Sequence, residues 1–214
     1  MNNARIQKLP SIRRLPSYLH RLNEMRFEGC DKVSTTLLAG HMNIEPIVVR
    51  KDLEITGVTG QPGVGYQVDE LIAAIKKFLG WDNTSEALLA GAGSLGSALL
   101  GYQGFEDYGL KIIAAFDTAA DKIGTRIHGC EVFELARLPE LSRKFHVCMG
   151  ILCVPPASAQ AVADLMIEGG IRAIWNFTSV SLQVPEGIVV QREVIASGLA
   201  VMSIKLQYEL NGWK

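Results

Sequence analysis

The sequence predicts an α/β protein in which a small, mainly helical domain precedes a doubly wound parallel sheet. In the first 80 residues, apolar positions recur at helical spacing around one glycine-rich segment. The remainder alternates short apolar runs with helical segments, which is typical of parallel strands covered by helices on both faces. A chain of 214 residues is long enough for one or two domains with a sizeable core.

Charge is divided unevenly between these two parts. The chain holds 21 basic and 22 acidic residues, and this balance alone argues against a nucleic-acid partner. Residues 1–80, however, hold 11 Lys/Arg and 8 Asp/Glu, whereas residues 81–214 hold 10 and 14. Residues 1–21 contain no acid, and their basic residues are Arg5, Lys8, Arg13, Arg14 and Arg21. Such a segment is either a solvated arm without a partner or part of a surface for a polyanion.

The chain shows no sign of export or of a membrane span. Its four cysteines form no CxxC pair, and no apolar stretch follows Met1, so we expect a reducing, cytoplasmic location. The segment Ala87–Gly104 is uncharged and just long enough to cross a bilayer. Five glycines interrupt it, so we expect a strand, a glycine turn and a helix there.

The N-terminal part predicts three helices before the glycine-rich segment. Ser17–Phe27 has helical spacing, with Pro16 tolerable in a first turn. A short helix follows at Thr35–His41. The third segment, Pro46–Glu54, contains three β-branched residues that favour a strand, but Pro46 at a first helical position favours a helix.

A hairpin and a fourth helix complete this domain. Two short strands are expected around a glycine-rich tip within residues 57–65. Val68–Leu79 has a clear apolar stripe, with Asp69 as its N-cap. The domain boundary then falls at Gly80–Asn83. This layout is that of a winged helix-turn-helix.

The C-terminal part predicts a sheet of Rossmann type. Its strands are expected at Ala87–Ala90, Ile112–Phe116, Val147–Val154 and Arg172–Asn176. A last helix, Val194–Leu210, has one apolar stripe. No internal repeat appears in the sequence.

The most informative motif is the glycine-rich segment Gly91-Ala92-Gly93-Ser94-Leu95-Gly96, which follows an apolar run and precedes a helical segment. In that context the first glycine makes the tight turn, the second lets a pyrophosphate approach, and the third allows close helix packing. Asp117 follows 21 positions after Gly96, where a carboxylate accepts hydrogen bonds from a ribose. We therefore expect the cofactor to be NAD, as NADH and as NAD+, and not NADP, because the carboxylate of Asp117 repels the 2′-phosphate of NADP. The alternative is a glycine turn in a domain without a ligand.

Catalytic and metal-binding residues are not evident. His20 and His41 lie in the basic region, and His146 precedes a buried strand, whereas His128 in a glycine-flanked loop stays open as a proton donor. No histidine pair has metal-ligand spacing, and no nucleophile is grouped with a base. We assign no catalytic residue and no metal.

Short motifs along nearly the whole chain are similar to those of one family. They are Arg14-Leu15-Pro16-Ser17-Tyr18, Val49-Arg50-Lys51-Asp52-Leu53, Gly63-Val64-Gly65-Tyr66, Gly91–Gly96, Phe116-Asp117, Lys122-Ile123-Gly124, Val154-Pro155, Ala159-Gln160, Asn176-Phe177-Thr178 and Val184-Pro185. In this order and spacing the chain resembles the Rex redox-sensing transcriptional repressors of bacteria.

The resemblance implies a homodimer that binds double-stranded operator DNA and is released when NADH binds. It implies a winged-helix DNA-binding domain at residues 1–80, an NAD(H)-binding domain at 81–192, and at 193–214 a C-terminal helix that is swapped between subunits. The implied cofactor-binding residues are Gly91, Ala92, Gly93, Ser94, Leu95, Gly96, Tyr102, Asp117, Val154 and Pro155. The implied DNA-binding residues are Arg14, Ser34, Arg50, Lys51, Gly63 and Tyr66.

Two positions depart from the family pattern. The wing tip reads Gly60-Gln61-Pro62-Gly63, where the family usually has Lys or Arg that probes the minor groove. Val194, next to Glu193, stands where the family has an aspartate at the head of the swapped helix. In one cofactor state of the family, that aspartate interacts with an arginine and a tyrosine. Arg14 resembles this arginine, and Tyr102 resembles this tyrosine. Tyr102 at a helix end is alternatively a packing residue.

Two alternatives stay open from the sequence. One is an NAD-dependent oxidoreductase with a helical assembly domain. The other is a paralogue that binds another nucleotide, such as coenzyme A, and has lost its operator.

Overall fold

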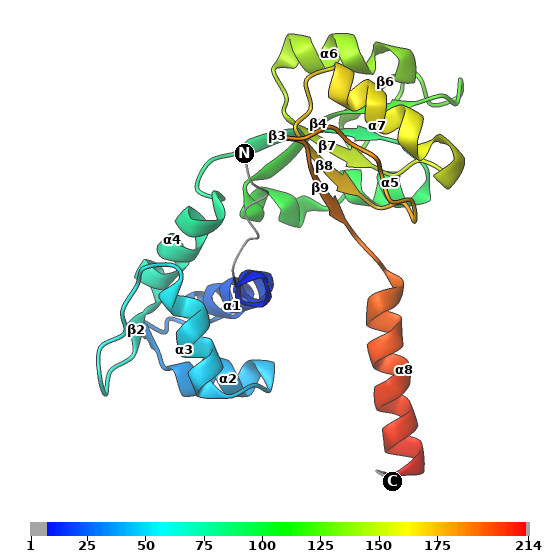
Figure 1. The fold of residues 1–214 in the computed structure, drawn as a ribbon. Coiled ribbons are helices and arrows are strands. Elements are labelled where there is room, and N and C mark those ends of the chain that lie inside the picture. Colours follow the sequence, from blue (N-terminus) through cyan, green and yellow to red (C-terminus); the bar gives the residue numbers. More distant parts are fainter. Residues whose placement is uncertain (1–7, 213–214) are drawn as a thin grey trace. The chain divides into compact units, whose positions relative to one another are not determined.

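The computed structural model describes residues 8–212 and divides near residue 84 into two compact units (Figure 1). Arg5 of the basic segment lies outside the described residues. The N-terminal unit contains α1 (Leu9–Phe27), β1 (Lys32–Val33), α2 (Thr35–Met42), α3 (Pro46–Glu54), β2 (Tyr66–Gln67) and α4 (Val68–Leu79). This is the predicted winged helix-turn-helix, in which α2 and α3 form the helix pair.

Helix α1 begins eight residues earlier than predicted, so that Pro16 lies inside it and not in its first turn. A proline in a helix interior costs about 3 kcal/mol, because it removes a backbone hydrogen bond and clashes with the preceding turn. Leu15, Leu19 and Leu22 on one face of α1 are fully buried. Each contributes about 1.5–3 kcal/mol, which outweighs the cost of the proline.

Helix α3 has the bounds that the sequence predicts, with Pro46 in its first turn. Val49 and Leu53 are both fully buried, whereas Arg50 and Lys51 are exposed. Tertiary burial of one helical face therefore decides against the strand that the β-branched residues favour.

The wing is paired differently from the prediction. β2 pairs antiparallel with β1, so that Tyr66 lies opposite Val33, and within the glycine-rich segment only the bridge between Gln61 and Gly65 forms. Gly65 has φ +94°, and a Cβ there would collide with the carbonyl oxygen of Val33. Glycine thus allows the two strands to approach. A two-residue strand has no alternation that the sequence could reveal.

Helix α4 also starts differently. Its N-cap is Gln67, the last residue of β2, and Asp69 lies in the first turn without a capping hydrogen bond. The helix begins directly at the end of the strand, so no room is left for the predicted cap. The carboxylate of Asp69 still interacts favourably with the positive, N-terminal end of the helix dipole.

The C-terminal unit contains a seven-stranded sheet within its described residues. Its strands are β3 (Ser85–Ala90), β4 (Leu110–Asp117), β5 (Arg126–Ile127), β6 (Cys130–Glu134), β7 (Met149–Leu152), β8 (Ala173–Asn176) and β9 (Val189–Arg192). Its helices are α5 (Ser94–Leu100), α6 (Leu138–Phe145), α7 (Ala159–Glu168) and α8 (Ala196–Asn211), with short 3₁₀ helices η1 (Gln103–Tyr108), η2 (Leu135–Arg137) and η3 (Pro156–Ser158).

The strand order is β5-β6-β4-β3-β7-β8-β9, and all neighbours except β5 and β6 are parallel. From β6 to β9 this is the doubly wound dinucleotide-binding order, which confirms the predicted fold class. The chain leaves β3 toward β4 and later returns to β7 on the other side of β3. Ligands in such sheets bind at that switch point, outside the carboxyl ends of the strands.

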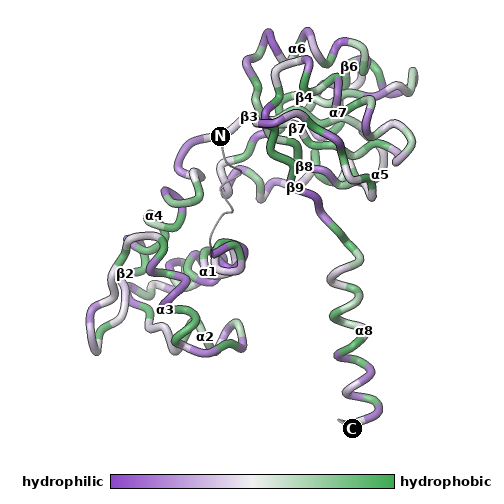
Figure 2. The backbone as a smooth tube through the Cα atoms, viewed as in Figure 1, coloured by the Kyte–Doolittle hydropathy of each residue, from purple (hydrophilic) through white to green (hydrophobic). Residues whose placement is uncertain are grey.

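Helices cover both faces of the sheet, and the hydropathy of the chain follows this arrangement (Figure 2). Leu88 and Phe116 pack with α6 and α7 on one face, whereas Ala87 and Leu89 pack with α5 on the other. Side chains alternate between the faces because successive strand residues point to opposite sides.

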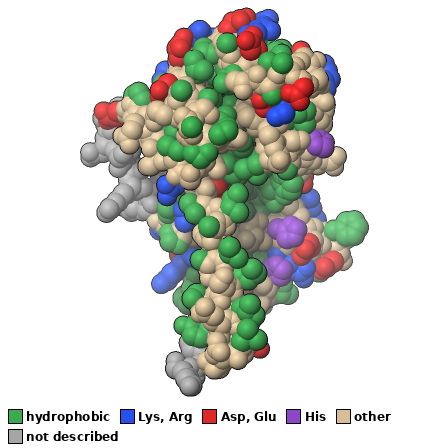
Figure 3. Space-filling view, turned by 90° about the vertical axis from the view of Figure 1, so that its right-hand side faces the viewer, with side chains coloured by type: hydrophobic (Ala, Val, Ile, Leu, Met, Phe, Trp, Pro, Cys, Tyr) green, Lys and Arg blue, Asp and Glu red, His purple; other side chains and the backbone are tan. Residues whose placement is uncertain are grey.

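Helix α8 is exposed along its whole described length (Figure 3). One stripe is formed by Leu199, Met202, Leu206 and Leu210, and nearly opposite lie Val201, Ile204 and Tyr208. The sequence predicts one stripe, whereas the helix has two. None of the described helices is long and apolar enough to cross a membrane.

Candidate nucleotide-binding and DNA-binding sites

The glycine loop after β3 is packed too closely for side chains at two positions. Gly91 has φ +95°, and a Cβ there would lie 2.6 Å from the carbonyl oxygen of Cys153, which follows β7. Its N–H donates to the carbonyl of Phe116 in β4 at 2.8 Å. A Cβ on Gly96 would collide with the carbonyl oxygen of Gly91. The turn is therefore locked against the ends of β4 and β7.

Gly93 lies on the open side of the same loop. It is the N-cap of α5, it is exposed, and a Cβ there would meet no atom within 4 Å. Ser94 and Leu95 are also exposed, and Ala92 is buried beneath them. The first N–H groups of a helix have no acceptor within it. A pyrophosphate can approach the backbone here without meeting a side chain.

Asp117 ends β4 beside this loop and accepts four hydrogen bonds. Its Oδ1 accepts from the N–H groups of Thr118 and Ala119 at 2.8 and 2.9 Å. Its Oδ2 accepts from the N–H of Ala92 at 2.9 Å and from Lys122 Nζ at 3.2 Å. Burial acts to raise the pKa of Asp117, but these donors outweigh it and lower the pKa. The carboxylate is therefore charged and tied to the glycine loop.

Lys122 belongs to the motif Lys122-Ile123-Gly124, but it was not predicted as a residue of the cofactor site. Its signal is its place five residues after Asp117, in a turn where the Lys122 N–H donates to Ala119. Val154 and Pro155 follow β7 and complete the edge, because Cys153 N–H donates to the carbonyl of Ala90. The structure thus brings Gly91–Gly96, Asp117, Val154 and Pro155 together at the carboxyl ends of β3, β4 and β7.

Tyr102 lies apart from them, beyond the other end of α5. Half exposed, its ring packs edge-on against Phe105, which in turn contacts Trp175. These rings belong to a hollow of about 490 Å³, which we call the aromatic hollow. Its lining residues are Ala98, Leu99, Tyr102, Phe105, Trp175, Phe177, Glu193, Val194 and Ile195. Glu193 Oε1 accepts from Trp175 Nε1 at 3.0 Å.

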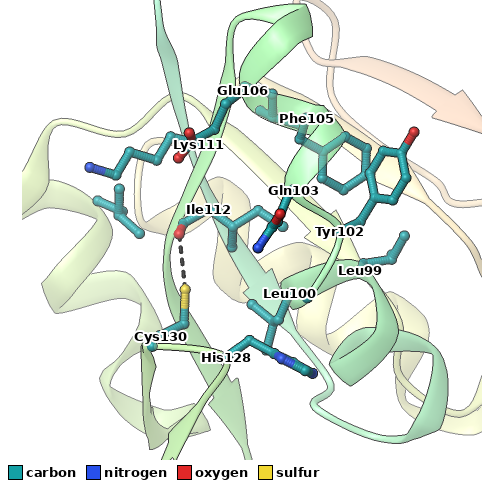
Figure 4. Close-up of a pocket in the computed structure, with 14 residues that line it drawn as sticks. Leu99, Leu100, Tyr102, Gln103, Phe105, Glu106, Lys111, Ile112, His128 and Cys130 are labelled. Atoms are coloured by element: carbon teal, nitrogen blue, oxygen red, sulfur yellow. Dashed lines mark hydrogen bonds between the residues drawn. The ribbon is translucent and has the colours of Figure 1, made fainter.

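A cavity of about 820 Å³ lies away from the glycine loop (Figure 4). It lies between the end of α5, η1, the start of β4 and the β5–β6 turn, and His128 and Cys130 line it. Cys130 Sγ donates to the carbonyl of Ile112. None of Gly91–Gly96, Asp117, Val154 and Pro155 lines this cavity. Among residues 8–212, no group of His, Cys, Asp or Glu could hold a metal ion.

The residues expected at a DNA interface divide into exposed and supporting ones. Arg50 and Lys51 are exposed on α3, and Gly63 lies exposed at the wing tip. Ser34 caps α2, its Oγ accepting from the N–H of Leu37 at 3.2 Å. Tyr66 is 7% exposed and its ring lies against Gly60, so it supports the wing.

Arg14 is engaged inside the N-terminal domain. Its Nε donates to Asp52 Oδ2 at 2.6 Å and its second nitrogen, Nη2, to Oδ1 at 2.8 Å. Tyr18 Oη donates to Asp52 Oδ2 at 2.7 Å. Asp52 is 1% exposed. Its only local signal is an acid on the helix face that also holds Val49 and Leu53, and its partners lie 34 and 38 residues away.

Comparisons with known proteins cover both domains. Residues 9–54 match the family model described as "Putative DNA-binding protein N-terminus", and residues 82–180 match the one described as "CoA binding domain". The chain is 44% identical over 206 residues to a redox-sensing transcriptional repressor Rex of Treponema denticola, covering 96% of this chain and 98% of that one. It is 43% identical over 193 residues to the Rex repressor of Porphyromonas gingivalis W83, covering 90% and 88%.

Solved structures are similar over the same length. The crystal structure of RSP in complex with beta-NAD+ and operator DNA has a TM-score of 0.86 and 33% identity, covering 95% of this chain and 94% of that one. RSP, which is described as a Rex-family repressor, in complex with beta-NADH also has a TM-score of 0.86, at 32% identity, covering 95% and 96%.

Two glycine substitutions separate ligand binding from folding. We predict that Gly93→Ala changes the free energy of unfolding by less than about 1 kcal/mol, because a Cβ fits there. It should weaken NADH binding at least about tenfold, because the same Cβ meets the pyrophosphate. Gly96→Ala should instead destabilise the protein by about 1–3 kcal/mol through the collision with Gly91. Thermal unfolding and NADH fluorescence titration measure both effects, and full NADH affinity in Gly93→Ala would contradict this placement.

Proposed function

Because this chain belongs to the Rex family of redox-sensing transcriptional repressors, we propose that its N-terminal domain binds operator DNA and that NADH at the glycine loop releases it. The observation that supports this best is that one chain holds both halves of such a device. The winged helix presents Arg50 and Lys51, and the glycine loop with Asp117 stands at the switch point of the sheet. The protein is a repressor and not an enzyme, which decides against the oxidoreductase alternative.

The cofactor site that we propose is the loop Gly91–Gly96 with Asp117, Val154 and Pro155. The loop holds the pyrophosphate, and Asp117 accepts from the adenosine ribose. Because Lys122 is the one side-chain donor on Asp117 among the described residues, its ammonium group is the donor that a ribose hydroxyl displaces with least rearrangement. Tyr102 then belongs to the nicotinamide end, beyond α5. The same chain binds NADH and NAD+. DNA is released because NADH binds more tightly to the state that does not bind operator than to the state that does.

The operator-binding surface that we propose is centred on α3, with Arg50 and Lys51 in the major groove and the exposed Lys8 and Arg13 near the start of α1 on phosphates. The wing tip, Gly60-Gln61-Pro62-Gly63, contributes no charge. Ser34 and Tyr66 hold α2 and the wing in place. A repressor of bacterial operators acts where the chromosome lies, so we also propose a cytoplasmic location.

The homodimer that we propose is formed through α8 and the aromatic hollow. A helix that is apolar on two opposite sides is stable in water when both sides are covered, and α8 is exposed on both in a single chain. The aromatic hollow is a second exposed apolar surface. A swapped α8 buries both kinds of surface against a second copy. Beside Tyr102, Glu193 is held by Trp175, and we propose that it supplies the carboxylate that Val194 lacks.

The first test is operator binding with each ligand. We expect fluorescence anisotropy to show tight binding with no ligand and with saturating NAD+, and at least about tenfold weaker binding with NADH. Coenzyme A serves as a further arm, because residues 82–180 match the "CoA binding domain" model. Equal affinity with NADH, NAD+ and no ligand would refute the redox sensor. Release by coenzyme A alone would assign the site to that nucleotide.

The second test concerns the charge of α3. Arg50→Ala with Lys51→Ala should weaken operator binding and reduce the slope of log affinity against log salt by about 0.9 for each phosphate that is no longer neutralised. Lys77→Ala, an exposed lysine on α4, is the matched control and should leave both unchanged. A lower affinity with an unchanged slope would instead place Arg50 and Lys51 on base edges.

The third test concerns α8. Leu199→Glu with Ile204→Glu places one charge on each apolar side, and sedimentation should show a monomer with much weaker operator binding. Gln207→Glu, an exposed residue between the two apolar sides of the same helix, controls for the added charge and should remain dimeric. A double variant that stays dimeric would show that α8 lies outside the subunit interface.

A further inference from the structure

The carboxylate of Asp52 is the one buried acid of the N-terminal domain among its described residues, and it joins two helices. Its partners, Arg14 and Tyr18, lie four residues apart on one face of α1, and Asp52 itself lies on α3. Three hydrogen bonds of 2.6–2.8 Å connect them. We call Arg14, Tyr18 and Asp52 the buried cluster.

We propose that the buried cluster is a positioning device for operator recognition: Arg14 and Tyr18 hold α3 at the rotation that presents Arg50 and Lys51 to DNA. This rests on the proposed function, because it assumes that α3 is the recognition helix.

Packing alone does not explain a carboxylate at this position. Val49 and Leu53 on the same face of α3 are fully buried, and an apolar residue at 52 would continue that surface. Replacing a buried ion pair by apolar residues of similar volume is often neutral or stabilising. What the charged cluster adds is direction. The planar fork of Arg14 meets both carboxylate oxygens at once, and this geometry tolerates little rotation of either helix.

The rotation of α3 sets the direction of the two exposed cations. Successive residues of a helix project about 100° apart, so Asp52 facing inward places Lys51 and Arg50 at set angles on the outside. Apolar contacts of Val49 and Leu53 allow a helix to roll or slide, whereas the hydrogen bonds of Asp52 do not. The buried cluster therefore couples α1, which carries the exposed Arg13, to the recognition helix as one rigid unit.

The cluster stays charged at neutral pH. Burial acts to raise the pKa of Asp52, but the hydrogen bonds from Arg14, Tyr18 and Ser11 outweigh it, so this pKa is lowered. Burial and the same carboxylate raise the pKa of Tyr18, which keeps its hydroxyl a donor. With two of its nitrogens on Asp52, Arg14 is a positioning residue and not a phosphate contact.

Conservative variants of Arg14 and Tyr18 test whether these residues position α3. Arg14→Lys keeps the charge and loses the fork, and Tyr18→Phe keeps the ring and loses the hydroxyl. Each should weaken operator binding about tenfold, comparable to removing one bidentate pair with a base, and should leave NADH affinity unchanged. Neither should weaken operator binding further once Arg50 and Lys51 have both been changed to alanine, because Arg14 and Tyr18 act through those two residues. Arg26→Lys, an exposed arginine on the same helix, is the control. Affinities are measured by anisotropy at several salt concentrations on protein whose folding is verified by thermal unfolding.

An apolar version of the cluster tests the proposal even if the single variants do not fold. The triple variant Arg14→Leu, Tyr18→Phe, Asp52→Leu removes both charges together, so no charged group is left buried without its partner. We expect it to fold and to bind operator more weakly than the wild type. Wild-type operator affinity in the folded triple variant would show that the cluster merely supports stability. In chains that already carry Arg50→Ala and Lys51→Ala, a salt slope that Arg14→Ala reduces further, by about 0.9 per subunit, would show that Arg14 itself contacts phosphate. A wild-type chain that binds no operator would refute the proposed function itself.

Discussion

The turn that connects β3 to α5 leaves no space for a side chain at either end, and the nucleotide site depends on this constraint. Gly91 lies against the backbone after β7, and Gly96 lies against the carbonyl of Gly91. The loop is thereby locked onto two neighbouring strands, and its open side at Gly93 faces outward. Asp117 extends the same framework, because it binds both the loop at Ala92 and the turn that contains Lys122. Backbone N–H groups that are held rigidly in this way can bind an anion without a basic side chain in the loop.

The two domains hold their functional elements in place by different means. In the sheet domain, backbone atoms approach closely where glycine removes the side chain. In the DNA-binding domain, a buried carboxylate with three hydrogen bonds fixes one helix against another. The charge of the chain follows the same division, since residues 1–80 hold the basic excess and residues 81–214 the acidic one. The near-neutral total hides a chain whose first part suits a polyanion and whose remainder does not.

Local patterns predicted much of this architecture. The apolar face of α3, the strands around β3, β4, β7 and β8, and the glycine loop with Asp117 all depend on spacing within one segment. Features that depend on distant residues were missed. The β1–β2 pair joins residues 33 and 66, and Asp52 finds its partners 34 and 38 residues earlier. The start of α1 was wrong because a local rule for Pro16 was outweighed by burial of the whole helix face. The second apolar side of α8 was missed because, in the proposed homodimer, it is covered by a second chain.

We propose that a nucleotide held by the glycine loop controls DNA binding by the other domain. It is tested most directly by measuring operator affinity across a series of NADH to NAD+ ratios, in the wild type and in Gly93→Ala. We predict that affinity falls as the ratio rises in the wild type and stays constant in the variant. A flat wild-type profile, or the same dependence in both chains, would contradict it.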